Sequence, residues 1–364
     1  KTNREHKMRK LLILSTALTS VAFAASAEKV TVMSWGGAYG MSQTEAYNKP
    51  FTGYTGIEAI MIDADNPAAP IKAMVEAGNV TVNVADVEFS DAVRFCDEGL
   101  LEVIDHSLLA GGADGTTAAE DFIDGALSSE CAVASIVWST VIAYDTSKTP
   151  DAASLADFWD TAKFPGKRGL RKGAKANLEI ALMADGVPAA EVYGVLETDA
   201  GVDRAFAKLD EIKGDVVWWE SGAQPAQLLA DGEVAMTVAY NGRIFNAAVA
   251  EGKPFGIIWD GQIMDLDMFV IPKGAPDQAA ALEYIKFATS TKGLADQAKY
   301  ISYGPARKSS APYVGLYQDG VTEMGPHMPT SPEALKNALL NNFAFWADRD
   351  TELNERFNSW LLAN

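Results

Sequence analysis

Short apolar segments alternate with helical segments along most of the chain, and this alternation limits the fold more than any other feature of the sequence. Strands are expected at 29–35, 57–62 and 84–89, with helices at about 41–53 and 70–77 between them. Strand, helix and strand in this order are typical of a mostly parallel sheet with helices on both faces. The pattern therefore predicts an α/β protein.

Two later segments are expected to run from one lobe of the molecule to another. Ser135–Tyr144 is too long for a strand of one compact lobe, and Asp267–Pro272 is the second candidate. Two α/β lobes joined by two crossing strands form a clamp, which holds a ligand between the lobes and closes by a hinge motion. The other expected strands of the second lobe are 169–171, 216–220, 234–241 and 255–259.

The length of 364 residues is enough for two lobes that each have a core. We expect residues 28–140 and 263–312 to form the first lobe. Residues 141–262 and 313–364 are expected to form the second lobe, which includes the C-terminal helices.

The N-terminal segment has the pattern of a secretory signal peptide. A basic pair at 9–10 precedes the apolar run Leu11–Ala25, and small residues follow up to Ala27. The run is shorter than a membrane-spanning helix requires. We therefore expect residues 1–27 to hold upstream residues and a signal peptide, and the mature protein to be exported to the periplasm.

Charge and cysteine content indicate which partners the protein favours and in which compartment it folds. The formal net charge is -19, which repels nucleic acid and favours cationic partners, although it also serves solubility. Cys96 and Cys131 are an even number of cysteines in an oxidising compartment, so we expect one disulfide. Two buried free thiols are the alternative.

Motifs for catalysis and for metal binding do not stand out in the sequence. His6, His106 and His327 lack zinc-ligand spacing, and GxSxG does not occur. The glycine turn at 36–40 lacks the spacing of a phosphate loop, and a tight turn beside a ligand is the better interpretation. We expect no catalytic residue, cofactor or metal. An exported enzyme that uses an acidic pair stays open as the alternative, because composition cannot exclude it.

Aromatic and acidic residues gather at the expected strand ends, where they could bind a cation. An aromatic face attracts a cation, and a carboxylate adds charge-assisted hydrogen bonds to an ammonium group. Side chains alternate along a strand, so only one of Trp218 and Trp219 can face the cleft, and the sequence does not say which. Trp138 is expected in core or hinge packing. The candidates are Trp35, Tyr39, Ser90, Trp219, Glu220, Tyr240, Asn241, Asp265 and Asp267.

At these residues the sequence resembles the spermidine/putrescine-binding proteins of ABC transporters, over nearly the whole mature chain. The resemblance implies a periplasmic-binding-protein fold, a small-molecule ligand, permease subunits as partners, and a monomer. It is carried by Ser34-Trp35, Phe158-Trp159 with Phe164-Pro165-Gly166-Lys167, Asp231-Gly232-Glu233-Val234 with Tyr240-Asn241-Gly242, Asp267 before Ile271-Pro272, and Tyr303-Gly304-Pro305.

The resemblance also implies roles for individual residues. Trp35, Tyr39 and Tyr240 would be walls of the site, and Asp267 would hold an amine. Ser90 and Tyr303 would face the ligand, and Asn341 would lie near its end.

The chain departs from the family pattern between residues 169 and 179. Polyamine binders usually offer acidic residues there, whereas this chain has Arg171, Lys172 and Lys175. Asp265 also replaces an expected aromatic residue. A second ammonium facing Lys172 would be repelled in a desolvated cleft, whereas a carboxylate would be attracted.

Two hypotheses about the ligand follow from this departure. In the first, the ligand is a zwitterion such as a betaine, a dimethylsulfoniopropionate-like osmolyte or an ω-amino acid, and Lys172 and Asn177 line the carboxylate end. In the second, Arg171 and Lys172 are solvated surface charges. Glu179 or Glu220 then supplies a second carboxylate, and the ligand is putrescine or spermidine.

Overall fold

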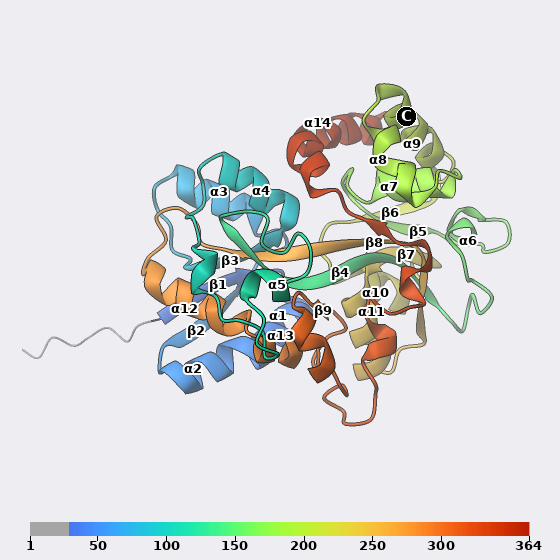
Figure 1. Cartoon of the computed structure of the whole chain (residues 1–364). Coiled ribbons are helices and arrows are strands. Elements are labelled where there is room, and N and C mark those ends of the chain that lie inside the picture. The colour runs from blue at the N-terminus through green and yellow to red at the C-terminus, as the bar shows by residue number, and fades with distance from the viewer. Residues whose placement is uncertain (1–28, 364) are drawn as a thin grey trace, which may run out of the picture.

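The computed structural model describes residues 29–363 and shows two α/β lobes that share one mixed sheet (Figure 1). The strand order is β2-β1-β3-β8-β4-β7-β5-β6, and two short strands are added because β9 (Gly304–Pro305) pairs with β4 and β10 (Leu339–Leu340) pairs with β8. The predicted two-lobed α/β fold is confirmed. The predicted signal peptide at 1–27 lies outside the described residues.

The first lobe contains β1–β3, and its strands run parallel as the sequence predicts. β1 (Lys29–Ser34) pairs with both β2 (Glu58–Asp63) and β3 (Val84–Glu88). Its core contains Val30, Val32, Phe51 and Phe269, all fully buried. The helices are α1 (Gly37–Gln43), which continues through a π-helical turn into α2 (Lys49–Thr55), α3 (Ala68–Glu76), α4 (Phe89–Asp97), α5 (Ala118–Asp121), α12 (Gln278–Ala288) and α13 (Thr291–Gln297).

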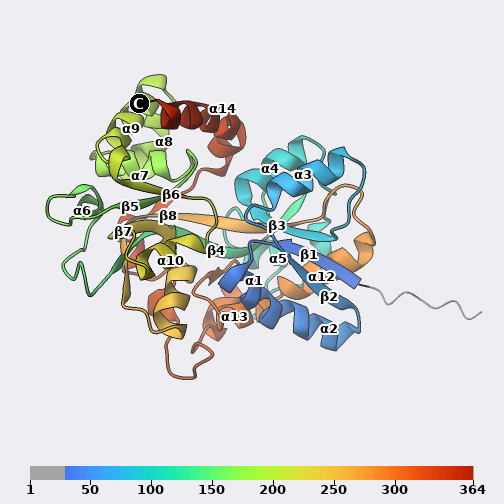
Figure 2. The same cartoon turned by 180° about the vertical axis from the view of Figure 1, so that it is seen from behind.

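The second lobe contains β5 (Arg168–Arg171), which lies parallel to both β6 (Val216–Trp219) and β7 (Met236–Tyr240). Its first helix begins with a capping box between Ser154 and Asp157. The helices are α6 (Leu155–Trp159), α7 (Asn177–Ala184), α8 (Val192–Leu196), α9 (Asp199–Asp210), α10 (Gln224–Ala230), α11 (Asn241–Phe245) and α14 (Phe343–Leu362). The view from behind shows that these helices cluster at the opposite end of the sheet from α2, α3 and α12 (Figure 2).

Two long antiparallel strands cross between the lobes, β4 (Ala132–Asp145) and β8 (Phe255–Val270). The prediction of separate strands at 255–259 and 267–272 is wrong, because both belong to β8 or extend it. The register shifts after Thr140, so that residues 259–262 of β8 lie opposite a single residue of β4. This bulge absorbs Asp260-Gly261, whose turn-like sequence suggests an end of the strand. The exact lobe boundaries stay a prediction.

No helix between residues 29 and 363 is both long enough and apolar enough to cross a bilayer.

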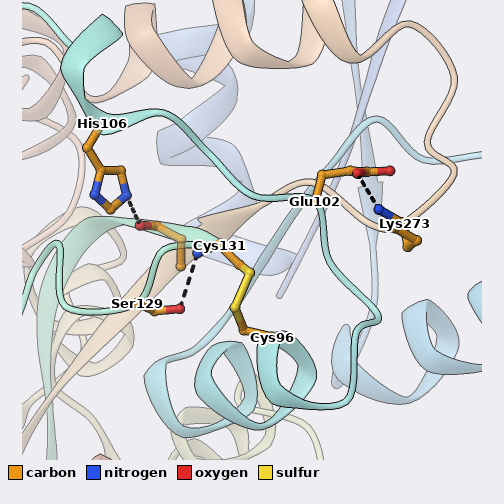
Figure 3. Close-up of a disulfide and its surroundings, with 7 residues drawn as sticks. Cys96, Glu102, His106, Ser129, Cys131 and Lys273 are labelled. Atoms are coloured by element: carbon orange, nitrogen blue, oxygen red, sulfur yellow. Dashed lines mark hydrogen bonds and ion pairs between the residues drawn. A yellow bond between two sulfur atoms is a disulfide. The ribbon is translucent and has the colours of Figure 1, made fainter.

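The predicted disulfide between Cys96 and Cys131 is confirmed. Figure 3 shows that it joins α4 to the segment that leads into β4. The two Cα atoms lie 5.8 Å apart, and the cysteines are separated by 35 residues in the chain. The neighbouring Ala132 carbonyl lies 3.0 Å from Nε2 of His106, and Lys273 pairs with Glu102 at 2.8 Å. The disulfide therefore ties a helix of the first lobe to the start of a crossing strand.

Replacing both Cys96 and Cys131 by alanine should lower the free energy of unfolding. The chain-entropy estimate for a loop of 35 residues is about 4 kcal/mol. Urea unfolding of the variant and of the oxidised protein, followed by circular dichroism, measures the difference. Equal midpoints and slopes would contradict the prediction.

Candidate ligand-binding cleft

Two adjoining cavities lie between the lobes, beside the crossing strands. The first encloses about 390 Å³ and the second about 370 Å³, both including space open to solvent. They share Glu88, Trp138, Arg171 and Tyr240. The first is also lined by Trp35, Tyr39, Asp65, Glu220, Gly222, Arg243, Asp267 and Tyr303, and the second by Thr140, Lys175, Ala176, Trp219, Val238, Ile263, Asp265 and Asn341.

Aromatic rings form much of the wall. Tyr39 packs edge-on against Tyr303 with ring centres 5.2 Å apart. Tyr240 packs edge-on against both Trp138, at 5.1 Å, and Trp219, at 5.6 Å. Predicted residues from segments far apart in the sequence thus line one space, and Trp138 joins them instead of lying only in the core.

The structure also decides between the two neighbouring tryptophans of β6. Trp219 lines the second cavity and is fully buried. Trp218 points the other way and packs against Phe357 and Trp360 of α14. Strand alternation requires this division, and the packing of α14 on one face of β6 fixes which ring faces the cleft.

Four carboxylates lie on one face of the paired strands β3 and β8, next to the cavities. Glu88 is directly opposite Asp267 in the antiparallel register, and Asp86 and Asp265 each stand two residues earlier in their strands. Residues two apart in a strand share a face, so the register brings all four acids together. Such a cluster in a buried place needs positive charges or protons.

Two basic residues of the second lobe reach across to this acidic face. Arg171, at the end of β5, donates to Glu88 with Nη1 and Oε1 3.1 Å apart, and its guanidinium lies 5.9 Å from the Tyr240 ring centre. Lys175, in the loop before α7, donates to Glu88 at 2.7 Å and to Asp265 at 2.8 Å. Burial alone would raise the pKa of Glu88, but Lys175 and Arg171 outweigh it and lower that pKa to about 2.

Asp267 differs from Glu88, because its charge is not neutralised in this way. Burial raises the pKa of Asp267 well above its usual range, and Asp86, Glu88 and Asp265 raise it further. Burial also raises the pKa of Asp86 to about 7, although hydrogen bonds from Tyr39, Gln43 and Ser34 oppose this. Tyr39 donates to Asp86 at 2.6 Å, which links an aromatic wall to the acidic face.

Arg243 of α11 is a third basic residue that reaches from the second lobe to the first. It donates to the carbonyls of Trp35, at 2.9 Å, and of Gly36, at 3.1 Å. A Cβ at Gly37 would lie 2.7 Å from Nη1 of Arg243, and the positive φ of 56° also favours glycine there. The predicted glycine turn is therefore the place where the arginine approaches the backbone.

Several polar atoms of the cavity walls are buried without a hydrogen-bond partner among the described residues. They are the indole N–H groups of Trp35, Trp138 and Trp219, Nε of Arg243, and Oδ1 of Asp267. Buried polar groups in folded proteins are almost always hydrogen-bonded, and each one left unpaired is costly. Their gathering around one space indicates a place built to contact a polar ligand.

Three predicted site residues lie in the cleft region but are occupied by other contacts. Asp265 accepts hydrogen bonds from Lys175 and from Asn341. Ser90 lies 3.3 Å from Nζ of Lys175. Asn241 is fully buried and bonds to the Ser139 amide and the Ser302 carbonyl, so it joins the chain segments behind the aromatic wall.

The residues predicted for a carboxylate end lie elsewhere. Lys172 pairs with Glu220 at 2.9 Å, and their side chains are 44% and 70% exposed, with only Glu220 reaching the first cavity. Asn177 donates to the carbonyls of Arg171 and Gly173, and so shapes the loop from behind.

Glu179, one of the two candidates for a second ligand carboxylate, points into the second lobe. It accepts hydrogen bonds from Trp346 at 2.6 Å and from Tyr193 at 3.1 Å. Burial raises the pKa of Glu179 to about 7. It is therefore engaged with core aromatic residues.

Sequence reasoning missed four charged residues of the walls, namely Asp65, Glu88, Lys175 and Arg243. The basic side chain that lines both cavities is Arg171, whereas the sequence favoured its neighbour Lys172. Strand alternation offered a signal here, because Arg171 and Gly169 share a face of β5 while Lys172 follows the last strand residue. The signal becomes usable only once the inward face of β5 is known.

The chain belongs to the family of bacterial extracellular solute-binding proteins, because residues 43–330 match that family. Proteins of this class deliver solutes to ABC importers. The predicted resemblance to ABC-transporter binding proteins is thereby confirmed at the level of the family.

Individual relatives agree with this assignment. The chain is 43% identical over 349 residues to the gamma-aminobutyric acid-binding protein of Pseudomonas aeruginosa, which covers 94% of this chain and 95% of the relative. It is similar to the solved structure of a GABA receptor, with 32% identity, a TM-score of 0.77, and coverage of 93% and 98%. It is also similar to the binding protein MotA of A. tumefaciens B6 in complex with glucopine, with 29% identity, a TM-score of 0.82, and coverage of 92% and 100%.

Replacing Glu88 by glutamine should destabilise the protein at neutral pH. Its pKa falls from 4.5 to about 2 on folding, which corresponds to roughly 3 kcal/mol. Because the folded-state pKa is lowered, this stability is present above pH 4.5 and is lost as the pH falls towards 2. The deficit of the variant, measured by urea unfolding at several pH values, should therefore shrink in acid.

Glu98→Gln is the matched control, since Glu98 forms an ion pair with Lys72 at 2.7 Å and both side chains are more than a third exposed. It should cost less than about 1 kcal/mol. A loss of the same size in both variants would contradict the interpretation of Glu88.

Proposed function

We propose that this protein is the periplasmic substrate-binding component of an ABC importer for a short ω-amino acid, with 4-aminobutyrate (GABA) as the leading ligand. The observation that carries the proposal is that the wall of the first cavity contains both an arginine and an unneutralised aspartate. Arg171 and Asp267 both line this cavity, and Oδ1 of Asp267 is buried without a hydrogen-bond partner among the described residues. A molecule with a carboxylate and an amine separated by methylene groups is complementary to both.

Arg171 suits the carboxylate of such a ligand. Among the described residues its hydrogen-bonding partner is Glu88, which takes one of the five N–H donors of a guanidinium. The remaining donors have the fork geometry that binds carboxylates in pairs of hydrogen bonds.

Asp267 suits the amine, and the aromatic walls suit the methylene chain. An ammonium beside Oδ1 would supply the positive charge that this carboxylate lacks, and the rings of Trp35, Tyr39 and Trp138 lie around the same cavity. The names of two relatives, which refer to gamma-aminobutyric acid and GABA, agree with this choice.

The other hypotheses remain outcomes of experiment. A polyamine would place a second ammonium near Arg171, which repels it. An exported enzyme using an acidic pair receives no support from the relatives, which carry names of binding proteins and receptors. Recovery of the ligand unchanged after prolonged incubation with the protein separates binding from turnover.

Calorimetric titration of GABA, butylamine, butyrate and putrescine should show tight binding of GABA alone. Arg171→Met should weaken GABA binding about 10- to 100-fold, because it removes charged hydrogen bonds to the carboxylate. The same substitution should change butylamine binding much less, since that ligand has no carboxylate.

Arg204→Met is the matched control, because Arg204 forms an exposed ion pair with Asp185 at 2.6 Å. It should leave GABA binding unchanged. Stronger binding of putrescine than of GABA by the unaltered protein would contradict the proposal.

Affinity for GABA should rise with pH. Burial and the neighbouring acids raise the pKa of Asp267, so this carboxyl keeps its proton to a higher pH than an ordinary aspartate and must lose it before it can pair with an ammonium. Release of one proton per ligand gives up to about a tenfold change in affinity per pH unit below that pKa. Calorimetry in buffers of different ionisation enthalpy measures the proton released.

Asp267→Asn should weaken GABA binding and reduce its dependence on pH, because the variant side chain has no proton to release. An affinity of the unaltered protein that does not rise with pH would contradict the assigned role of Asp267.

A further inference from the structure

Lys175 stands out among the charged residues of the cleft because its ammonium is fully engaged by the protein. An ammonium group has three N–H donors. Those of Lys175 are directed to Glu88 at 2.7 Å, Asp265 at 2.8 Å and Ser90 at 3.3 Å. No donor remains for a ligand carboxylate, so Lys175 does not share the task proposed for Arg171.

These partners form an amine-binding site in their own right. Two carboxylates and a hydroxyl surround a single ammonium, and both carboxylates are buried. The amide of Asn341 donates to the same oxygen of Asp265, Oδ2, that accepts from Lys175. A free alkylammonium ligand would require the same set of acceptors.

This occupied site lies one step along the acidic face from the proposed ligand amine site. Asp265 and Asp267 share a face of β8 two residues apart, which separates them by about 6.6 Å along the strand. The two cavities adjoin through Glu88 and Trp138. A diamine with four methylene groups would span from Asp267 to the position of the Lys175 ammonium.

The loop that carries Lys175 is held in place by unusual backbone features. The next residue, Ala176, has a φ of 69°, which is rare for a residue other than glycine. Asn177 ties the loop together through the carbonyls of Arg171, at 2.6 Å, and Gly173, at 2.7 Å. A strained conformation persists where surrounding contacts enforce it, and here the contacts direct Lys175 at the acidic face.

We propose that Lys175 is a specificity-determining residue that acts as a tethered ammonium: it fills a second amine site between Glu88 and Asp265 and so excludes diamines from the cleft. The inference rests on the proposed function, because Asp267 is taken as the first amine site. In this proposal, the preference of the cleft for ligands with one amine depends on the side chain of Lys175. A protein with the same acidic face but without this lysine would accept a diamine.

Lys175→Met tests this inference, because methionine keeps an apolar stem of similar length and removes the charge. Calorimetric titration with putrescine should show a gain of at least about tenfold in affinity over the unaltered protein, as charged hydrogen bonds form to Glu88 and Asp265. Putrescine should also raise the melting temperature of this variant and leave that of the unaltered protein unchanged.

Lys163→Met is the control, since Lys163 pairs with Asp157 at 3.0 Å on the outside of the second lobe. It should show no gain. The double variant Lys175→Met/Asp265→Asn should lose the gain, because half of the acceptor pair has lost its charge. If Lys175→Met does not fold alone, Lys175→Gln, which keeps a hydrogen-bond donor for the carboxylates, takes its place in the same titration.

A folded Lys175 variant that binds putrescine no better than the unaltered protein would overturn the inference. This result is distinct from failure of the proposed function. If the unaltered protein binds GABA and the variant gains no diamine binding, the tethered-ammonium role is wrong and the ω-amino acid function stands. If the unaltered protein binds no ω-amino acid but the variant gains putrescine binding, the ω-amino acid function is wrong and the tethered-ammonium role of Lys175 stands.

Discussion

The pairing of Arg171 and Lys175 with the acidic face of β3 and β8 is the interaction on which the cleft depends. The antiparallel register places Glu88 beside Asp267 and brings Asp86 and Asp265 onto the same face. Four carboxylates in a buried place repel one another, and burial itself disfavours their charged forms. The second lobe supplies two cations to Glu88 and Asp265, whereas Asp86 and Asp267 have raised pKa values.

This arrangement joins the stability of the cleft to its selectivity. The cations that neutralise Glu88 and Asp265 come from β5 and the loop after it, so the same contacts hold the two lobes together. Removing one partner of a buried ion pair leaves an uncompensated buried charge. This charge lowers the stability of the folded protein much more than burying the intact pair does. Asp86 and Asp267 have no cation partner among the described residues, and of these two acids it is Asp267 that lines the first cavity.

Much of the architecture was predictable from local patterns. The strands of both lobes, the first crossing strand and the disulfide follow from alternation, strand length and cysteine count. The full length of the second crossing strand was not predictable. Asp260-Gly261 has the sequence of a turn, and only the pairing of β8 with β4 makes this segment a bulge within a continuous strand. In the site, Trp35, Tyr39, Tyr240, Asp267 and Tyr303 were expected together, and they line one cavity.

The sequence alone determined that the chain alternates strand and helix, that aromatic and acidic residues stand at strand ends, and that the segment after residue 168 is basic. Only the tertiary structure decided which charges meet. Lys172 and Arg171 are neighbours in sequence, yet one lies exposed beside Glu220 and the other is held against Glu88. Lys175 and Asp265 are 90 residues apart and form a buried pair. Strand register and loop conformation set these contacts, and neither is encoded in the identity of a single residue.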